Sequence, residues 1–462
     1  LTPVEIAAIL KVSKQLTNWV ADVSAYALKQ AMASNTVYPG WKLVEGRSNR
    51  EITDTEAAAK ILSKYYDDTE IFNKKLKGIT DLEKLMGKAA FDKKLGALVI
   101  KPQGGPTLAP EDDKRLPINS AEAAAEVYYP LYTGGDAGGM DRKNVFIVVM
   151  EGIGSGLVDA VNNIEGFRAD SVTLMPFLDS LARESYIFTN AYSTGRSSSQ
   201  GLTAILGGFP AFAPLVYMHS PYSNNQLDGV PELLAGEGYS SVFYCGCSKG
   251  SYAFEALSRA VGYRRFVGRE EYGNDADYDG TWGIFDDKMA KYVINDVSKE
   301  PEPFIGAWFN LDTHHPFVIP EEFRGRYRHP DRTHYQTVEY YDDVLKGFFA
   351  DAARHEWYAN TLFIIVADHG SLLHDPVYNG PNTLYKVPII LYTPDGSIPK
   401  GIDEKPASQI DIAPTILGYL NYGKPRISFG QDLLDPEAPR FAVSYVNGLY
   451  QIVEGDYLLH FD

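Results

Sequence analysis

Acidic side chains and a histidine stand directly after two apolar segments of the chain. Glu151 follows residues 144–150, and Asp368 and His369 follow residues 361–367. Polar residues at the ends of parallel strands line the crevice where α/β proteins bind ligands. Two carboxylates and an imidazole suit a hard-to-borderline divalent cation. The alternatives are a solvated or helix-capping Glu151, and a turn in which Asp368 is the cap and His369 is exposed.

Three consecutive serines, Ser197, Ser198 and Ser199, precede the apolar segment 202–206, which we interpret as a helix. A hydroxyl at a helix N-terminus lies at the positive end of the helix dipole, beside backbone N–H groups that can hold phosphoryl or sulfuryl oxygens. A metal ion can lower the pKa of such a hydroxyl and make it a nucleophile. The alternative is that the serines only cap the helix.

A pair of histidines, His314 and His315, follows an apolar segment that ends at Leu311. An imidazole in this position could bind a substrate oxygen or protonate a leaving group. The alternative is that both are ordinary loop residues. We interpret Trp282, in the segment 279–287, as a packing residue.

Strands and helices alternate after residue 143, which predicts an α/β domain with a largely parallel sheet. The apolar segment 144–150 is of the buried-strand type. The other predicted strands are 241–244, 303–311, 361–367 and 387–392, and the predicted helices are 174–185, 335–355 and 410–419.

The first part of the chain has a different character. Residues 4–16 show apolar residues at helical spacing, and residues 101–122 are polar and rich in proline. A glycine-rich joint follows at 134–139. We therefore expect a mainly helical segment at 1–122, a linker at 123–143 and a catalytic α/β domain at 144–462.

The charge of the chain is −17 and is unevenly spread. Residues 1–128 carry 18 basic and 17 acidic residues, whereas the rest carries 25 basic and 43 acidic residues. Strong nucleic-acid binding is therefore not expected. No run of 18 apolar residues occurs, so no transmembrane segment is predicted in this chain. The only cysteines, Cys245 and Cys247, are too close in sequence for an ordinary disulfide.

Taken in order, the motifs from about residue 129 to 462 resemble the lipoteichoic acid synthase family, whose sulfatase-like domain belongs to the alkaline phosphatase superfamily. The matching segments are 129–132, 144–151, 173–179, 194–196 through 208–210, 282–284, 314–317, 360–369 and 411–415. The resemblance implies an alkaline-phosphatase/sulfatase-like three-layer α/β domain with a largely parallel central sheet, preceded by the mainly helical N-terminal segment.

The resemblance also implies one divalent metal ion, with Mn²⁺ favoured and Zn²⁺, Mg²⁺ or Ca²⁺ as alternatives. Its ligands would be Glu151, Ser198, Asp368 and His369, with Ser198 as the catalytic nucleophile. Ser197 and Ser199 are the alternative nucleophile candidates, because a shift of the alignment by one residue would place either of them at the nucleophile position. The implied substrate-binding residues are His314, His315, Arg196 and Cys245.

This sequence departs from the family at positions that hold glycerol phosphate. The family has His-Gly-Asp where this chain has Cys245-Gly246-Cys247, and Phe254 stands near a family arginine. The metal and nucleophile positions match, but the substrate is left open. The formylglycine motif of other sulfatases is absent from the sequence.

The expected function is a metal-dependent hydrolase or transferase of phosphoryl or sulfuryl esters, of the phosphoglycerol transferase type. Its substrate would be a phosphate or sulfate ester, lipid- or glycan-linked in some relatives, and the resemblance implies an extracytoplasmic or cell-envelope-facing site. The alternatives are a phosphodiesterase or sulfatase acting on a small or glycan-linked ester, and a catalytically silent binding protein with the same fold.

Residues 1 to about 120 resemble something else, the C-terminal part of a phage protein family related to RecB-type nucleases. The segments that carry this resemblance are 38–50, 78–88 and 107–119. No catalysis is assigned to this segment.

Overall fold

The computed structural model forms two compact units, Leu1–Val127 and Tyr128–Asp462. In the first unit it describes residues 27–29, 31–32, 41–45, 51–52, 54–66, 79–95, 98–100 and 106–110. In the second it describes residues 131–132, 139–162, 173–211, 216–223, 225–373, 376–446 and 448–461. The predicted helical pattern at 4–16 and most of the predicted joint at 134–139 lie outside the described residues.

The first unit contains a small helical core. Helices α2 (Thr55–Leu62), α4 (Ile79–Met86) and α5 (Lys88–Leu95) bury apolar side chains against one another, among them Leu82 and Phe91. The helical prediction for this region is thus confirmed. Short antiparallel pairs that the sequence did not indicate accompany the helices: β1 (Trp41–Glu45) with β4 (Pro106–Pro110), and β2 (Glu51–Ile52) with β3 (Val99–Ile100).

The second unit is built on an eight-stranded sheet of order β10-β9-β11-β6-β12-β13-β7-β14. The strands are β6 (Asn144–Met150), β7 (Tyr186–Phe188), β9 (Ser240–Cys245), β10 (Arg265–Val267), β11 (Phe304–Phe309), β12 (Thr361–Ala367), β13 (Ile389–Tyr392) and β14 (Gly401–Asp403). The first five strands of this order are parallel, and within this sheet only β13 runs antiparallel to its neighbours. The largely parallel sheet is confirmed.

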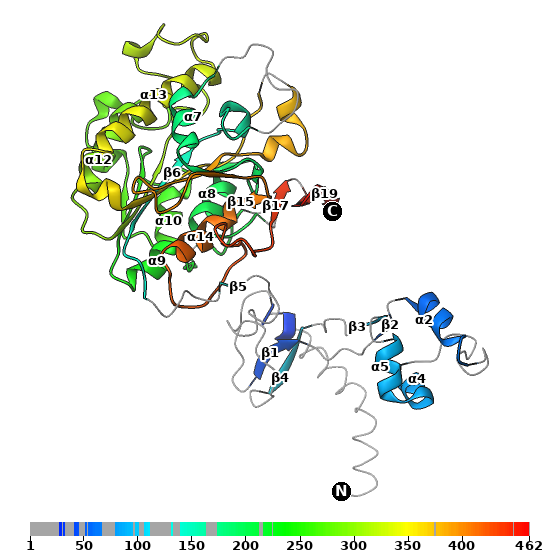
Figure 1. The fold of residues 1–462 in the computed structure, drawn as a ribbon. Coiled ribbons are helices and arrows are strands. Elements are labelled where there is room, and N and C mark those ends of the chain that lie inside the picture. The colour runs from blue at the N-terminus through cyan, green and yellow to red at the C-terminus, as the bar shows by residue number, and fades with distance from the viewer. Residues whose placement is uncertain are drawn as a thin grey trace, which may run out of the picture. The chain divides into compact units, whose positions relative to one another are not determined.

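Helices cover both faces of this sheet (Figure 1). Helices α7 (Pro176–Arg183), α12 (Asp286–Val297) and α13 (His334–Ala352) cover one face, and α8 (Ser198–Gly207), α9 (Val230–Ala235), α10 (Phe254–Ala260) and α14 (Ile412–Tyr419) cover the other. Every residue of β6 is buried, because its side chains alternate between the two layers. The three-layer architecture follows from this double burial.

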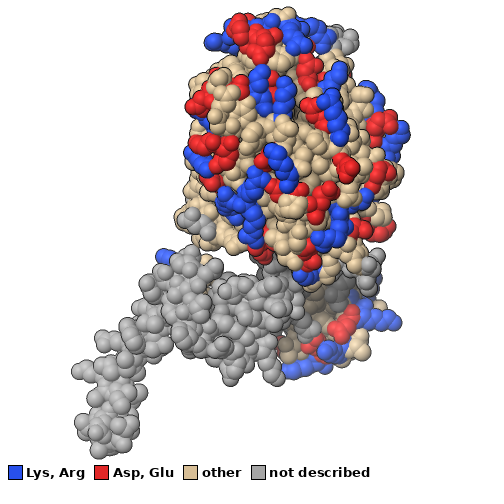
Figure 2. Space-filling view, turned by 90° about the vertical axis from the view of Figure 1, so that its left-hand side faces the viewer, with Lys and Arg blue, Asp and Glu red and all other residues tan. Residues whose placement is uncertain are grey.

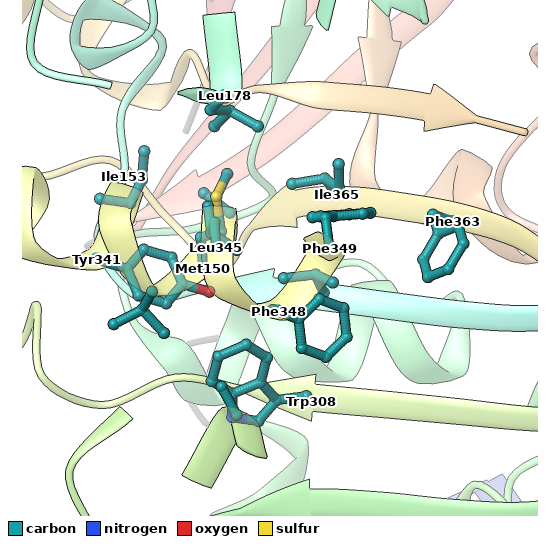
Figure 3. Packing of buried hydrophobic residues seen from close by; sticks show 14 of the residues in the cluster. Met150, Ile153, Leu178, Trp308, Tyr341, Leu345, Phe348, Phe349, Phe363 and Ile365 are labelled. Carbon is teal, nitrogen blue, oxygen red and sulfur yellow. The ribbon is translucent and has the colours of Figure 1, made fainter. Parts of the chain in front are cut away.

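The core under α13 is aromatic. Met150, at the end of β6, lies among Tyr341, Phe348 and Trp308, and the rings of Trp308 and Phe348 stack at 5.3 Å (Figure 3). Rings of this size bury much apolar area. They fix the end of β6, from which the next residue, Glu151, projects.

Smaller pairings complete the second unit. Strand β8 (Ala191–Tyr192) pairs with β15 (Ala407–Ser408), and β5 (Leu131–Tyr132) pairs with β16 (Arg426–Ile427). Strands β17 (Phe441–Val446), β18 (Leu449–Glu454) and β19 (Tyr457–Phe461) form an antiparallel meander. The second unit also contains the short helix α11 (Arg269–Tyr272). None of the described helices is long and apolar enough to cross a membrane. On the face shown in Figure 2, basic and acidic side chains are interspersed.

Helix α8 lies very close to the end of β12. A Cβ placed on Gly201 would stand 2.0 Å from the backbone oxygen of Asp368, far inside contact distance. Only glycine allows this approach. The first turn of α8, with its serines, is therefore held against the segment that carries Asp368 and His369.

We predict that Gly201→Ala lowers the free energy of unfolding by about 1–3 kcal/mol, because a methyl group cannot be inserted without moving the backbone. Gly347→Ala is the matched control. Gly347 also lies inside a helix, and a Cβ added there would meet nothing within 4 Å, so alanine should raise stability by about 0.5–1 kcal/mol. Urea unfolding followed by circular dichroism measures both. Equal effects of the two substitutions would contradict the close approach.

Candidate active site

The pairing of β6 with β12 brings the two acidic residues together. The strands are parallel, and Met150 lies opposite Ala367. Glu151 and Asp368 are the next residues on each strand, so their side chains leave the sheet side by side at its carboxyl edge. Both are buried, with 3% and 0% of their surfaces exposed. Burial of two adjacent carboxylates is unfavourable without a compensating positive charge.

Ser198 and His369 complete this cluster. The Ser198 hydroxyl donates to Glu151 Oε2 at 2.9 Å. His369 Nε2 lies 3.4 Å from Glu151 Oε1 and 3.5 Å from Asp368 Oδ2. Ligand atoms of Glu151, Asp368 and His369 all fall within 4.8 Å of one another. The four residues that the sequence singled out as metal ligands are thus in one place.

The ring of His369 is oriented by its own loop. Its Nδ1 lies 3.1 Å from the carbonyl oxygen of Gly370, which can only accept a hydrogen bond. Nδ1 therefore carries the proton, and in the neutral ring Nε2 presents a lone pair toward Glu151 and Asp368. This is the tautomer that binds a metal ion through Nε2.

Asp368 is fixed through one of its oxygens only. Its Oδ1 accepts from the backbone N–H groups of Gly152 and His369, at 2.9 and 2.7 Å. Its Oδ2 is buried and has no hydrogen-bond partner among the described residues. Burial and the charge of Asp368 hold the pKa of Glu151 well above its ordinary value. No Lys or Arg of the described part of the chain forms an ion pair with either carboxylate.

These observations fit a bound cation. An unpartnered carboxylate oxygen, a second buried carboxylate and an imidazole lone pair converge, with no Lys or Arg from the described residues to neutralise them. Two oxygens and one nitrogen match the ligand preferences of Mn²⁺ and, among the alternatives, Zn²⁺. The Ser198 hydroxyl is the fourth candidate ligand.

Residues that sequence reasoning missed hold Glu151 in place. The Asn310 side chain accepts from the Glu151 backbone N–H at 2.7 Å and donates to Asp286 and to Thr313. The Thr313 hydroxyl in turn donates to the Glu151 carbonyl oxygen at 2.7 Å. Asn310 directly follows β11, which pairs with β6, and its polar side chain at a strand end was the available signal.

A second support lies under Asp368. The Gln409 amide nitrogen donates to the carbonyl oxygens of Ala367 and Asp368, each at 2.7 Å, and its oxygen accepts from the Thr194 N–H at 3.0 Å. Gln409 therefore connects the end of β12 to the loop that leads into α8. Nothing in the local sequence around Gln409 indicated this role.

The predicted substrate-binding residues make no described side-chain contact with the metal-site cluster. His314 packs against Trp282 with ring centroids 4.3 Å apart, and its Nδ1 lies 2.7 Å from the His315 carbonyl oxygen. His315 and Arg196 are exposed. No described hydrogen bond or ion pair joins any of these side chains to the metal-site cluster, so their roles stay predictions.

Cys245 is the predicted substrate residue with the least accessible side chain. Its surface is fully buried, its thiol contacts that of Cys247 at 3.0 Å, and burial raises its pKa. A buried neutral thiol paired with another thiol is poorly suited to hold a charged ester.

The second unit matches the family model described as Sulfatase over residues 143–422, more than half of the chain. The chain therefore belongs to the sulfatase family, within the alkaline phosphatase superfamily. Residues 1–116 match a different model, described as a protein of unknown function (DUF2800). The N-terminal segment is thus separate in family as well as in structure, and its predicted relation to phage proteins stays a prediction.

The curated relatives of the chain include lipoteichoic acid synthases and phosphoglycerol transferases. The chain is 23% identical over 376 residues to lipoteichoic acid synthase 2 of Bacillus subtilis, covering 76% of this chain and 55% of that protein. It is 24% identical over 306 residues to phosphoglycerol transferase I of Xanthomonas axonopodis pv. citri, covering 58% and 40%. The chain spans about half the length of these curated relatives.

Two solved structures share the fold. One is an alkaline phosphatase superfamily protein from Vibrio parahaemolyticus, with a TM-score of 0.62 and 25% identity over 71% of this chain and 78% of that one. The other is the lipoteichoic acid synthase LtaP from Listeria monocytogenes, with a TM-score of 0.61 and 18% identity over 73% and 88%. The expected superfamily fold is confirmed.

We predict that Asn310→Ala lowers the free energy of unfolding by about 1–3 kcal/mol, because it leaves the Glu151 N–H and Asp286 without their buried partner. Asn360→Ala is the control, since Asn360 makes one long hydrogen bond, 3.4 Å, at the surface. Its effect should stay within about 0.5 kcal/mol. Chemical unfolding of both variants measures the difference. If Asn310→Ala is as stable as the Asn360→Ala control, the hydrogen bonds of Asn310 do not stabilise the backbone at Glu151.

Proposed function

We propose that the second unit is a divalent-metal-dependent enzyme that transfers or hydrolyses phosphoryl esters, of the phosphoglycerol transferase type, with Ser198 as nucleophile. The observation that carries this proposal is the contact of the Ser198 hydroxyl with Glu151, within a cluster that also holds Asp368 and His369. Similarity to lipoteichoic acid synthase 2 and phosphoglycerol transferase I favours phosphoryl over sulfuryl esters.

Glu151, Asp368, His369 and the Ser198 oxygen would hold the metal ion. When bound, the ion would lower the pKa of the serine hydroxyl and offset negative charge on the ester. Mn²⁺ is the ion we favour, from the ligand set and the family resemblance. The N-terminus of α8 adds the positive end of its helix dipole beside Ser198.

The proposed reaction has two steps. Ser198 Oγ forms a bond to phosphorus as the bond to the leaving alcohol breaks, and the serine becomes a phosphate ester. The serine releases its proton to solvent, and the leaving alcohol gains one, for which His314 is our candidate donor. In the second step, water or a second alcohol attacks phosphorus and releases a proton, the bond from phosphorus to Ser198 Oγ breaks, and Oγ takes up a proton to restore the hydroxyl.

The proposed partner is a phosphate ester whose alcohol is lipid- or glycan-linked. A cavity of about 290 Å³ lies beside α8. Its polar lining residues are Ser199, Gln200, Thr203 and Ser220, and its apolar and aromatic ones are Phe209, Pro210, Ala211, Val216, Tyr217 and Tyr222. Such a lining suits the largely apolar body of a linked alcohol better than an inorganic ion. An extracytoplasmic site, by analogy with the family, belongs to the same proposal.

We predict that Ser198→Ala lowers turnover of bis(4-nitrophenyl) phosphate by roughly a thousandfold or more, because the nucleophile is lost. Ser197→Ala is the matched control that should keep activity within about tenfold. Product analysis with and without added glycerol separates transfer from hydrolysis, and 4-nitrophenyl sulfate tests the sulfatase alternative. A Ser198→Ala enzyme with full activity would refute the assignment. Ligand binding without any turnover in the wild type would instead favour the silent binding protein.

We predict that Asp368→Asn and His369→Ala each weaken Mn²⁺ binding by at least roughly 100-fold. Even residues that only hydrogen-bond to a metal ligand, without binding the metal themselves, contribute about 10–100-fold to metal affinity. Titration calorimetry and elemental analysis measure affinity and stoichiometry, with about one ion per chain expected in the wild type. Asp351→Asn is the control, since Asp351 forms a surface ion pair with Arg354. If all three variants bind Mn²⁺ like the wild type, the ion is held elsewhere.

A further inference from the structure

The two cysteines of the chain face each other inside the second unit. Cys245 is the last residue of β9, and Cys247 follows it by two positions. Their sulfur atoms are 3.0 Å apart, and the two residues are 0% and 1% exposed. Because the chain contains no other cysteine, each thiol has only the other as a possible covalent partner within the molecule.

The surroundings of this thiol pair are apolar and closely packed. Cys245 and Cys247 belong to the core layer that also contains Phe254, Phe309 and Leu311. Burial, with a smaller contribution from Cys247, raises the pKa of the Cys245 thiol. Side chains that are already ordered lose little rotamer freedom when they are joined. The fold has therefore already supplied most of the ordering that a bond between the two sulfur atoms requires.

A bond between the sulfur atoms needs only a small movement. Bonded sulfur atoms lie about 2.05 Å apart, so the two must approach each other by about 1 Å. The ring that closes spans only Cys245, Gly246 and Cys247. A ring of this size departs from the ordinary disulfide geometry, and such strained disulfides are the labile, reversibly reduced ones.

The backbone between the thiols is held by a neighbouring segment. Cys247 forms a β-bridge with Gly283, and the Gly246 carbonyl oxygen accepts from the Ile284 N–H at 3.0 Å. A Cβ placed on Gly283 would stand 2.4 Å from the Gly246 carbonyl oxygen, so the two backbones are in direct contact. A constraint on residues 245–247 is therefore passed on to residues 283–284.

The segment on the other side of this contact carries Trp282. Its indole N–H donates to the His315 carbonyl oxygen at 2.6 Å, and its ring packs against that of His314 with centroids 4.3 Å apart. The thiol pair is thus connected, through Gly283, to the loop of the two candidate substrate histidines.

We propose that Cys245 and Cys247 are a modification site that closes to a disulfide in oxidising surroundings, and that this disulfide restrains the Trp282 segment. The oxidant is itself a disulfide, such as oxidised glutathione. One cysteine thiolate attacks it and releases one glutathione thiol, and the other cysteine then attacks the mixed disulfide and releases a second. The two hydrogens that the protein loses end on the two glutathione thiols.

Exchange takes place while the chain folds, because both thiols are inaccessible to solvent in the folded protein. Burial then protects the product, although its ring is strained. A cell-envelope-facing location, as proposed above, would supply the oxidising surroundings. Nothing in this step depends on chemistry at Ser198.

The mass of the full chain, made in two compartments, tests the disulfide. One sample is exported to a bacterial periplasm with a cleavable signal, and the other is kept in the reducing cytoplasm. After alkylation under denaturing conditions, we expect the exported chain to be a monomer that lacks two hydrogens and carries no alkyl group, and the cytoplasmic chain to carry two. Exported Cys247→Ser, which has one thiol, is the matched control and cannot lose two hydrogens. Two alkyl groups on the exported wild type, or a mixed disulfide or dimer in its place, would overturn the proposal.

Reduction of the exported chain tests where the bond lies. Reduced glutathione should open it at least about 100-fold more slowly in the native protein than in urea, because the buried bond must be exposed by local unfolding before a thiolate can attack it. Equal rates in the two solutions would show that the bond is not in the buried position, and would contradict the proposal.

Hydrogen exchange tests the connection to Trp282. Peptides that cover residues 281–286 should exchange at least about threefold more slowly in the oxidised than in the reduced wild type, because the closed ring limits local opening. Strand β13 is the internal control and should not change, since three strands separate it from β9 in the sheet. The reduced wild type serves as the reference, so no variant has to fold. If residues 281–286 exchange equally in both forms, the disulfide does not restrain this segment and that part of the proposal is wrong.

Discussion

The site depends on one unfavourable interaction, the burial of two carboxylates side by side. The register between β6 and β12 places Glu151 and Asp368 next to each other at the edge of the sheet, where water cannot screen them. In such a place, burial and the neighbouring charge raise the pKa of Glu151, which favours its neutral form unless a cation intervenes. The chain offers an imidazole and no Lys or Arg of its described part, which makes an external cation the natural partner of the pair.

The surrounding structure resists the relaxation that this repulsion would otherwise cause. Glu151 is held at its N–H and its carbonyl oxygen by Asn310 and Thr313, and Asp368 is held at its carbonyl oxygen by Gln409. These partners bind the backbone and leave carboxylate oxygens available. Preorganisation of this kind keeps ligands in position before the ion arrives, so that little free energy is lost in ordering them on binding. Gly201 extends the same rigidity to the helix that carries Ser198.

The strands and helices that the sequence predicted in the second unit are present, because apolar segments are local signals, whereas the grouping of Glu151, Ser198, Asp368 and His369 was implied by the family resemblance. Apolar segments such as 361–367 predict buried strands, and a polar residue straight after each strand must lie at the sheet's edge. Asn310 and Gln409 were not predicted, because their roles come from contacts more than forty residues away, which no local pattern records. The antiparallel pairing of β13 could not be predicted either, since the apolar residues of a strand do not indicate in which direction it runs in the sheet.

The two halves of the site therefore differ in what determines them. The half that would activate a nucleophile is fixed by strand register. The half that would recognise an alcohol is built from loops and helix ends, which tolerate replacement. In this chain two buried thiols, those of Cys245 and Cys247, contact each other. A change of substrate by this route needs no change in the metal ligands, because recognition and activation are attached to different elements of the fold.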